Sequence, residues 1–499
     1  MQARRTRRSR LIFGGLVILL LIAALFPGIQ RQEWTDRLAV RNQPYFWAGV
    51  NYPWKSYQDF GTGAWGHSGV SEPITYDEVD TDFTNMAAQG IRVVKWRVFN
   101  DGRYGPRFDE RGFATGLAPE FYADLAAALE IAQKHDIYLV FTLFNSQIWT
   151  TACARQGVRF GWGPIIMTDP ARRAALLHNG IEPFLRQVAR SDRVLAFEII
   201  AEPEWGIAEL HTDQDWRQKL PLTAVRSFVR DVARSIHANT KALATVESNR
   251  PTYMQYWRGL GLDYYSFSWY DWMAPYDPLD VPASSHGLDR PVVLGEFPVS
   301  ASEYYTIDQA LDTARRQGYA GAFAWSFAAA DQYSRWADAR KNFTAWLRQN
   351  WLEINVAGDG AAPPSPDAPV LPQPYAHSDA RFHVERGILV ADVDLWVRGG
   401  GDLVAKFFLY PGDGSSTEPL AEREHFVAVP DGKPQLLSAV FDGLKDGLHY
   451  RLSLGLFDRS FNMLKWFDGL ALFGVNGGQI ELPKPTQEQV ENPCYGVGQ

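Results

Sequence analysis

Residues 197–203 read Phe-Glu-Ile-Ile-Ala-Glu-Pro, a mostly apolar run that ends in an acidic residue followed by proline. The same design recurs at residues 292–298, which read Val-Val-Leu-Gly-Glu-Phe-Pro. Runs that are apolar at nearly every position are typical of parallel strands, because both faces of such strands are covered. Each run therefore predicts a buried strand with a glutamate, Glu202 or Glu296, at its carboxyl end.

Six further apolar runs alternate with helical patterns along residues 45–351. The predicted strands are 45–51, 91–99, 137–144, 195–200, 242–247, 264–267, 292–297 and 321–327. The predicted helices are 77–89, 119–135, 170–190, 222–237, 307–317 and 336–351, the third with Asp169 as N-cap and Pro170 at its first position. Eight strand units in about 310 residues indicate a TIM (β/α)8 barrel. An open doubly wound sheet would carry a G-x-G-x-x-G turn after a strand, and the sequence has none.

The rest of the chain divides into segments of different composition. Residues 1–30 hold five arginines and then an uncharged run from Leu11 to Phe26, which predicts a transmembrane anchor with a cytoplasmic amino terminus. A cleaved signal peptide is the alternative, and either would export the rest of the chain. We expect the barrel over residues 40–352, a Pro-rich linker over 353–376, an antiparallel β-sandwich over 377–485 and a tail over 486–499. The expected location is a bacterial-type inner membrane, crossed once, with the catalytic domain periplasmic or extracellular.

Composition and missing motifs argue against several classes of protein and site. A net charge of −8 argues against a nucleic-acid partner. The ten histidines form no H-E-x-x-H motif, so we expect no metal and no other cofactor. A serine hydrolase is disfavoured because Gly-x-Ser-x-Gly is absent. The two cysteines, Cys153 and Cys494, allow one bridge at most, which would tether the tail to the barrel mouth.

The two strand-end glutamates carry the predicted chemistry. The active site of a TIM barrel lies at the carboxyl ends of its strands, and strands four and seven face each other across the barrel mouth. Glycoside cleavage requires one carboxyl as proton donor and a second as nucleophile or base. Retention of configuration would place the carboxyl groups of Glu202 and Glu296 about 5–5.5 Å apart. Either glutamate alone would also fit a helix cap or an arginine ion pair.

Several strand motifs together resemble the retaining β-glycosidases of clan A, in particular the cellulases and mannanases of glycoside hydrolase family 5. They are Glu-Ile-x-x-Glu-Pro at 198–203, Leu-Gly-Glu-Phe at 294–297, Trp-Ala-Gly-Val-Asn-Tyr at 47–52, the second-strand region 88–102, Tyr-Ser-Phe-Ser-Trp-Tyr at 265–270 and Ala-Phe-Ala-Trp-Ser-Phe at 322–327. The resemblance covers roughly residues 45–350. It implies that Glu202 is the acid/base, Glu296 the nucleophile, Tyr270 a hydrogen-bond partner of the nucleophile and Trp325 the stacking floor under the cleaved sugar.

Three positions depart from the family pattern. Ala201 stands where the family has the Asn that grips the sugar 2-hydroxyl, and Ser268 stands where it usually has His. Lys95 stands in place of Arg, although Arg97 lies two residues on and on the same strand face. The truncations at Ala201 and Ser268 indicate a sugar with an altered 2-position, a slow or transferring enzyme, or a barrel that binds glycans without cutting them.

Further residues at the predicted barrel mouth have expected roles. We expect substrate contacts from Asn51, Lys95, Arg97, Trp54, Trp205 and Trp269, and exposed loop rings at Trp149 and Trp272. Glu198 should lie deeper in the barrel in an ion pair with Lys95 or Arg97. Glu204 is the rival for the acid/base role.

The sequence therefore predicts a membrane-anchored, outward-facing retaining β-glycosidase that cleaves inside a polysaccharide chain by double displacement. Two alternatives use the same residues. One is a non-hydrolytic glycan-binding barrel that serves polysaccharide assembly or export. The other is a transglycosylase, which excludes water from the second step.

Overall fold

The computed structural model describes residues 36–62, 67–102, 104–150, 152–155, 158–210, 218–329, 331–358, 360–385, 388–412, 416, 418–477 and 479–482. The predicted anchor within residues 1–30, the tail 486–499 and Cys494 lie outside these ranges. Within them, no helix combines the length and the apolar character that crossing a membrane would need.

Eight parallel strands close into a barrel. In barrel order they are β10 (Val194–Ala201), β11 (Leu243–Ser248), β12 (Tyr265–Ser268), β13 (Val292–Pro298), β14 (Gly321–Trp325), β3 (Trp47–Tyr52), β4 (Val93–Arg97) and β7 (Tyr138–Phe144). Each overlaps one of the eight predicted strands. The predicted TIM barrel is confirmed.

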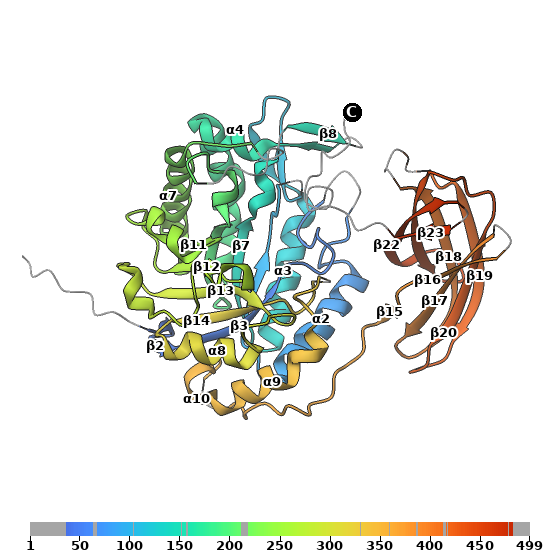
Figure 1. Ribbon diagram of the computed structural model, residues 1–499. Helices are drawn as coiled ribbons and strands as arrows, with labels where there is room; N and C mark the ends of the chain where they lie inside the picture. Colours follow the sequence, from blue (N-terminus) through green and yellow to red (C-terminus); the bar gives the residue numbers. More distant parts are fainter. Residues whose placement is uncertain are drawn as a thin grey trace, which may run out of the picture. The chain divides into compact units, whose positions relative to one another are not determined.

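Helices surround the barrel strands (Figure 1). They are α2 (Pro73–Ala88), α3 (Pro119–Lys134), α4 (Trp162–Thr168), α5 (Pro170–Leu176), α6 (Glu182–Val188), α7 (Leu222–Asn239), α8 (Ile307–Arg316), α9 (Trp336–Gln349) and α10 (Trp351–Ile354). After β11 and β12, in residues 249–291, the connections hold only short 3-10 helices: η4 (Pro251–Trp257), η5 (Asp271–Met273) and η6 (Ala283–His286). The remaining pieces of the barrel are the hairpins β1 (Leu38–Val40)–β2 (Gln43–Tyr45), β5 (Pro106–Phe108)–β6 (Ala114–Leu117) and β8 (Cys153–Arg155)–β9 (Val158–Phe160), and the 3-10 helices η1 (Ser146–Trp149) and η3 (Pro203–Gly206).

The helix predicted over residues 170–190 begins as expected and runs to Val188, but it is not α-helical throughout. Asp169 caps it by accepting hydrogen bonds from the backbone N–H groups of Ala171 and Arg172. A π-helical turn, η2 (Leu177–Ile181), separates α5 from α6. Pro183 follows this turn and has no N–H to donate, while its ring would clash with the carbonyl four residues earlier in a regular α-helix. A widened turn accommodates that proline.

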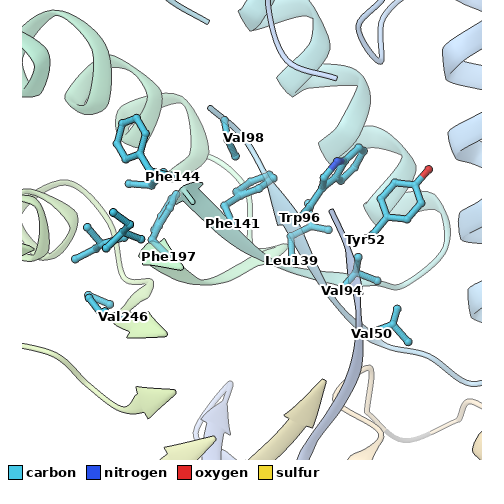
Figure 2. Close-up of a cluster of buried hydrophobic side chains, with 14 of the residues drawn as sticks. Val50, Tyr52, Val94, Trp96, Val98, Leu139, Phe141, Phe144, Phe197 and Val246 are labelled. Atoms are coloured by element: carbon cyan, nitrogen blue, oxygen red, sulfur yellow. The ribbon is translucent and has the colours of Figure 1, made fainter. Parts of the chain in front are cut away.

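The strand residues alternate between two environments. Val94, Trp96 and Val98 face outward and belong to the large cluster beneath the helices, together with side chains of β3, β7, β10 and β11 (Figure 2). Val93 faces inward and packs in a second cluster inside the barrel. Because alternate residues of a strand point to opposite faces, Lys95 and Arg97 share the inward face with Val93.

The barrel interior changes from apolar to polar along the strands. The second cluster includes Trp47, Tyr138, Ala196 and Val293 near the amino ends of their strands. Buried polar side chains follow toward the carboxyl ends, namely Asn51, Lys95, Thr142, Glu198, Glu247 and Ser266. This order brings charged groups to the end of the barrel at which TIM-barrel active sites lie.

The carboxyl-terminal part forms two antiparallel sheets around one core. One sheet holds β15 (Tyr375–His377), β16 (Arg381–Glu385), β17 (Ile388–Val397) and β20 (Gln435–Phe441). The second holds β18 (Gly401–Pro411), β19 (Ala421–Val429), β21 (His449–Phe457), β22 (Met463–Asn476) and β23 (Gln479–Glu481). Alternate residues of β17, including Ala391, Val393 and Leu395, are buried with residues of β18 and β21. These sheets confirm the predicted change from parallel to antiparallel structure after the barrel.

Candidate active site

Glu202 directly follows β10, where the strand becomes irregular. The pairing register shifts between Glu198 and Ala201, and Ile199 and Ile200 both pack in the outer cluster, so the alternation of faces stops there. Glu202 itself adopts a left-handed conformation with φ 53° and ψ 51°, which is uncommon for a residue other than glycine and is typical of functional sites.

Two hydrogen bonds hold Glu202 in this conformation. Its backbone N–H donates to the carbonyl of Glu247 over 2.7 Å, and the indole Nε1 of Trp205 donates to its Oε2 over 2.9 Å. The glutamate predicted to be the acid/base therefore has both its backbone and its carboxylate fixed by neighbours.

Glu296 lies in β13 at a second irregularity. The register with β14 shifts between Leu294 and Phe297, which both pack in the outer cluster, so one extra residue is accommodated between them. The Tyr270 hydroxyl donates to Glu296 Oε1, the contact that the family resemblance implied. Arg97 Nη2 lies 3.9 Å from Oε2 of Glu296.

The two glutamates share one electrostatic environment. Burial raises the pKa of Glu202, and the charge of Glu247 raises it further. Burial also raises the pKa of Glu296 well above its usual value, with added contributions from Glu247 and Glu202. Arg97 counteracts the raised pKa of both carboxyls, while the Tyr270 hydroxyl donates to Glu296 alone and favours the charged form there.

Two tryptophan rings lie beside Arg97. The Arg97 guanidinium lies 4.8 Å from the ring centroid of Trp325 and 5.7 Å from that of Trp54. The indole Nε1 of Trp325 donates to Asp331 Oδ2 over 2.8 Å. Trp54 is partly exposed, as is Trp205, so these predicted sugar-contacting rings are accessible at the strand ends.

Two tryptophans lie elsewhere than predicted. Trp149 and Trp269 are buried rather than exposed, because long connections cover the outer side of the barrel here. The Trp269 indole donates to the carbonyl of Asp277 over 2.9 Å, and its backbone N–H donates to the carbonyl of Glu296 over 2.8 Å. Trp269 therefore holds the backbone of Glu296 through a hydrogen bond and is too deeply buried to offer a ring face to a sugar. Trp272 is half exposed, as expected.

Asn51 and Lys95, predicted to contact substrate, are also buried. The Asn51 amide donates to the carbonyl of Gly295 over 3.1 Å and so ties β3 to β13. Lys95 Nζ lies 3.3 Å from Glu198 Oε2 and 2.8 Å from Glu247 Oε2. Arg97 rather than Lys95 lies beside Glu296, so the β4 cation next to this carboxylate is an arginine.

The remaining predicted glutamates have structural partners. The ion pair between Glu198 and Lys95 confirms the prediction for Glu198, and burial raises the pKa of this carboxyl to about 7. Glu204 is fully buried, where its two oxygens accept from the backbone N–H of Asn249 and the indole of Trp257. Burial raises the pKa of Glu204 to about 7. With both oxygens bonded inside the protein, Glu204 is no rival for the acid/base role.

The two truncated positions lie on either side of β11. Ala201 ends β10, and Ser268 ends β12, where it pairs in register with Glu296. The Ser268 hydroxyl is buried and has no hydrogen-bond partner within 3.5 Å among the described residues, yet it lies near enough to Glu202 to counteract the raised pKa of that carboxyl. The nearest polar group to this hydroxyl is thus the carboxyl of Glu202.

Sequence reasoning missed Glu247, which is buried at the end of β11 and affects both glutamates. Its run, Ala-Thr-Val-Glu-Ser at 244–248, is less apolar than the runs ending at Glu202 and Glu296. The rule that favours strand-end carboxylates applies to it equally, and would have found it. No cluster of three or more potential metal ligands occurs within the described ranges.

The barrel is similar in sequence to known glycosidases. No protein-family model matches the chain. The chain is 23% identical over 326 residues to a mannan endo-1,4-beta-mannosidase of Cryptopygus antarcticus, covering 57% of this chain and 81% of that protein. It is 21% identical over 325 residues to a mannan endo-1,4-beta-mannosidase of Mytilus edulis, covering 56% of this chain and 83% of that protein.

Solved structures share the fold. The beta-1,4-mannanase from the common sea hare Aplysia kurodai matches with a TM-score of 0.54 and 21% identity, covering 65% of this chain and 98% of that chain. The beta-mannanase from the blue mussel Mytilus edulis matches with a TM-score of 0.54 and 20% identity, covering 64% of this chain and 96% of that chain. In sequence and in fold the chain is therefore a relative of glycoside hydrolases of the mannanase type, which confirms the resemblance that its strand-end motifs carry.

Proposed function

We propose that this protein is a retaining endo-β-mannanase that cleaves β-1,4-linked mannan. The observation that supports this most is the pairing of Glu296, held by Tyr270 and Arg97, with a half-buried Glu202 of raised pKa. The names of the related proteins supply the substrate class.

In the proposed reaction, Glu202 gives its proton to the glycosidic oxygen while Glu296 attacks the anomeric carbon. Formation of the ester neutralises Glu296, so Arg97 and Tyr270 no longer face a charge there. Glu202, now ionised, accepts a proton from the water that hydrolyses the ester, which returns both glutamates to their starting state. The Trp325 ring beside Arg97 provides an apolar face for the cleaved sugar.

The direct test is incubation of the full chain with β-1,4-mannan, glucomannan, β-glucans and bacterial exopolysaccharides. New reducing ends and a rapid fall in chain length on mannan would establish endo-hydrolysis. Redistribution of chain lengths without new reducing ends would instead indicate a transglycosylase. Binding without either change would show that the barrel does not cut.

Retention gives a stereochemical prediction. If Glu296 forms a covalent intermediate, the sugar released first from mannan is expected to have the β-configuration at its new reducing end, before mutarotation sets in. Proton NMR of the anomeric signals during the first minutes of reaction measures this. Initial release of the α-anomer would rule out double displacement and would imply a wider carboxyl separation.

Ala201→Asn tests the departure at the sugar 2-position. Mannan has a free 2-hydroxyl, so the new amide is expected to raise kcat on β-mannan about tenfold, part of the roughly 10²- to 10³-fold that one preorganised transition-state donor contributes. Steady-state kinetics of both forms measures this, with Ala201→Val as the control for added volume alone. A fall of kcat for Ala201→Asn on the best substrate would indicate a sugar whose 2-position is substituted or absent.

We also propose that the chain is exported and anchored through its first thirty residues. The five arginines ahead of the uncharged run from Leu11 to Phe26 support this orientation. Membrane fractionation of producing cells, followed by protease treatment of intact spheroplasts, tests it. Recovery of the chain in the cytosolic fraction, protected from protease, would contradict the proposal.

A further inference from the structure

Glu247 lies between the two glutamates of the proposed mechanism. It is on the inward face of β11, because its neighbours Ala244 and Val246 pack in the outer cluster. Its backbone carbonyl accepts the N–H of Glu202 over 2.7 Å. Its side chain reaches toward the residue that precedes Glu296. Glu247 therefore contacts the elements that carry both glutamates.

Gly295 provides the space for this side chain. A Cβ atom at Gly295 would lie 2.2 Å from Oε1 of Glu247 and 2.1 Å from the hydroxyl oxygen of Ser266, distances too short for any substituent. The glycine of the Leu-Gly-Glu-Phe segment is therefore needed to let the Glu247 carboxylate pack directly beneath the backbone that leads into Glu296.

The two oxygens of Glu247 have different surroundings. Oε2 lies 2.8 Å from Lys95 Nζ. Oε1 accepts no hydrogen bond from any residue that the structure describes, although it is buried. Lys95 also serves Glu198, so one ammonium is shared by two carboxylates and the charge of Glu247 is compensated only in part.

The charged groups around Glu247 leave a deficit of positive charge. The groups that interact with Glu247 are the carboxyls Glu198, Glu202 and Glu296, the ammonium of Lys95 and the phenol of Tyr264. Arg97 and the phenol of Tyr270 lie one step further away, beside Glu202 and Glu296. Glu204 in η3 is occupied by Asn249 and Trp257. With Glu247 itself, four carboxylates thus share two cations, and at least one proton must be retained among them.

We propose that Glu247 is a positioning residue: its carboxylate, compensated only in part by Lys95, keeps a proton on Glu202. The leaving group needs this proton in order to depart. The inference rests on the proposed function, in which Glu202 is the acid. The charge of Glu247 raises the pKa of both Glu202 and Glu296. Glu198, in contrast, acts mainly on Lys95, the cation it shares with Glu247.

The test compares Glu247→Gln with Glu198→Gln. Both replace a buried carboxyl bonded to Lys95 by an isosteric amide, so they match in size, burial and the loss of a partner of Lys95. Glu247→Gln is expected to move both limbs of the kcat/KM pH profile to lower pH by about one unit. Glu198→Gln is expected to move them by less than half as much. Glu247→Asp keeps the charge and should restore the wild-type limbs even where it lowers kcat.

Equal displacement of the limbs in the two glutamine variants, or none in Glu247→Gln, would overturn the proposal. If Glu247→Gln does not fold, Lys95→Met tests the same coupling with opposite sign at Glu202, because it uncovers the charge of Glu247 and should move the Glu202 limb to higher pH. The Glu296 limb does not test it, since Lys95 also acts on Glu296 directly. Carbon-13 NMR titration of the glutamate carboxyl groups needs no turnover. The wild-type protein could show no glycosidase activity while its Glu202 carboxyl titrates at higher pH than in Glu247→Gln. That result would refute the proposed function but uphold the role of Glu247.

Discussion

Glu296→Gln is expected to lower kcat on β-mannan by at least about 10⁴-fold, because an amide cannot form the glycosyl ester on which double displacement depends. The amide oxygen can still accept the Tyr270 hydroxyl, so the geometry of the site is preserved. Binding of mannan oligosaccharides is therefore expected to change by less than about threefold. Single-turnover kinetics and isothermal calorimetry measure the two quantities, and turnover at the wild-type rate would show that Glu296 is not the nucleophile.

The same variant carries its own folding control. Burial and neighbouring charges raise the pKa of Glu296, so the native state binds this proton more tightly than the unfolded chain does. Stability therefore declines as pH rises from the ordinary carboxyl range toward the raised pKa. Glu296→Gln removes that decline and should melt at an equal or higher temperature than wild type, most clearly at the upper end of this range. A lower melting temperature would attribute the lost activity to misfolding.

The sequence was sufficient for the barrel and for the two central glutamates. Eight apolar runs of strand length leave few alternatives to a closed parallel sheet, and Glu202 and Glu296 stand at the carboxyl ends of two of them. The cap at Asp169 was also predictable, because its geometry depends on only three or four consecutive residues. Each of these signals is local or strictly periodic.

Features that depend on contacts between strands could not be read in this way. Alternation of faces fails at the ends of β10 and β13, where bulges bring Glu202 and Glu296 into position. Whether Lys95 or Arg97 meets Glu296 depends on the depth of each in the barrel, which strand parity does not give. The burial of Trp269 depends on a connection of more than twenty residues between β12 and β13 that folds back over it.

Glu202→Ala has the second largest expected effect and separates acid catalysis from binding. On β-mannan, whose leaving sugar needs a proton, kcat/KM is expected to fall about 10³-fold, within the range for loss of a general acid. On a dinitrophenyl β-mannobioside the leaving phenolate needs no proton, so formation of the ester should be nearly as fast as in wild type. Hydrolysis of the ester then becomes limiting, and a burst of phenolate is expected in stopped-flow absorbance.

Glu204→Ala is the matched control, since Glu204 is a second glutamate only two residues on, whose pKa burial raises to about 7. Its carboxylate holds the backbone of Asn249 and the indole of Trp257, so its loss should lower the melting temperature. It should affect the two substrates to the same extent and show no burst, because no proton transfer to the leaving group is lost. Azide, which attacks the ester without a base, should accelerate turnover of the aryl substrate by Glu202→Ala and not by Glu204→Ala. If Glu202→Ala slows both substrates equally and azide has no effect, the proton donor is another group, and the left-handed conformation of Glu202 requires a different explanation.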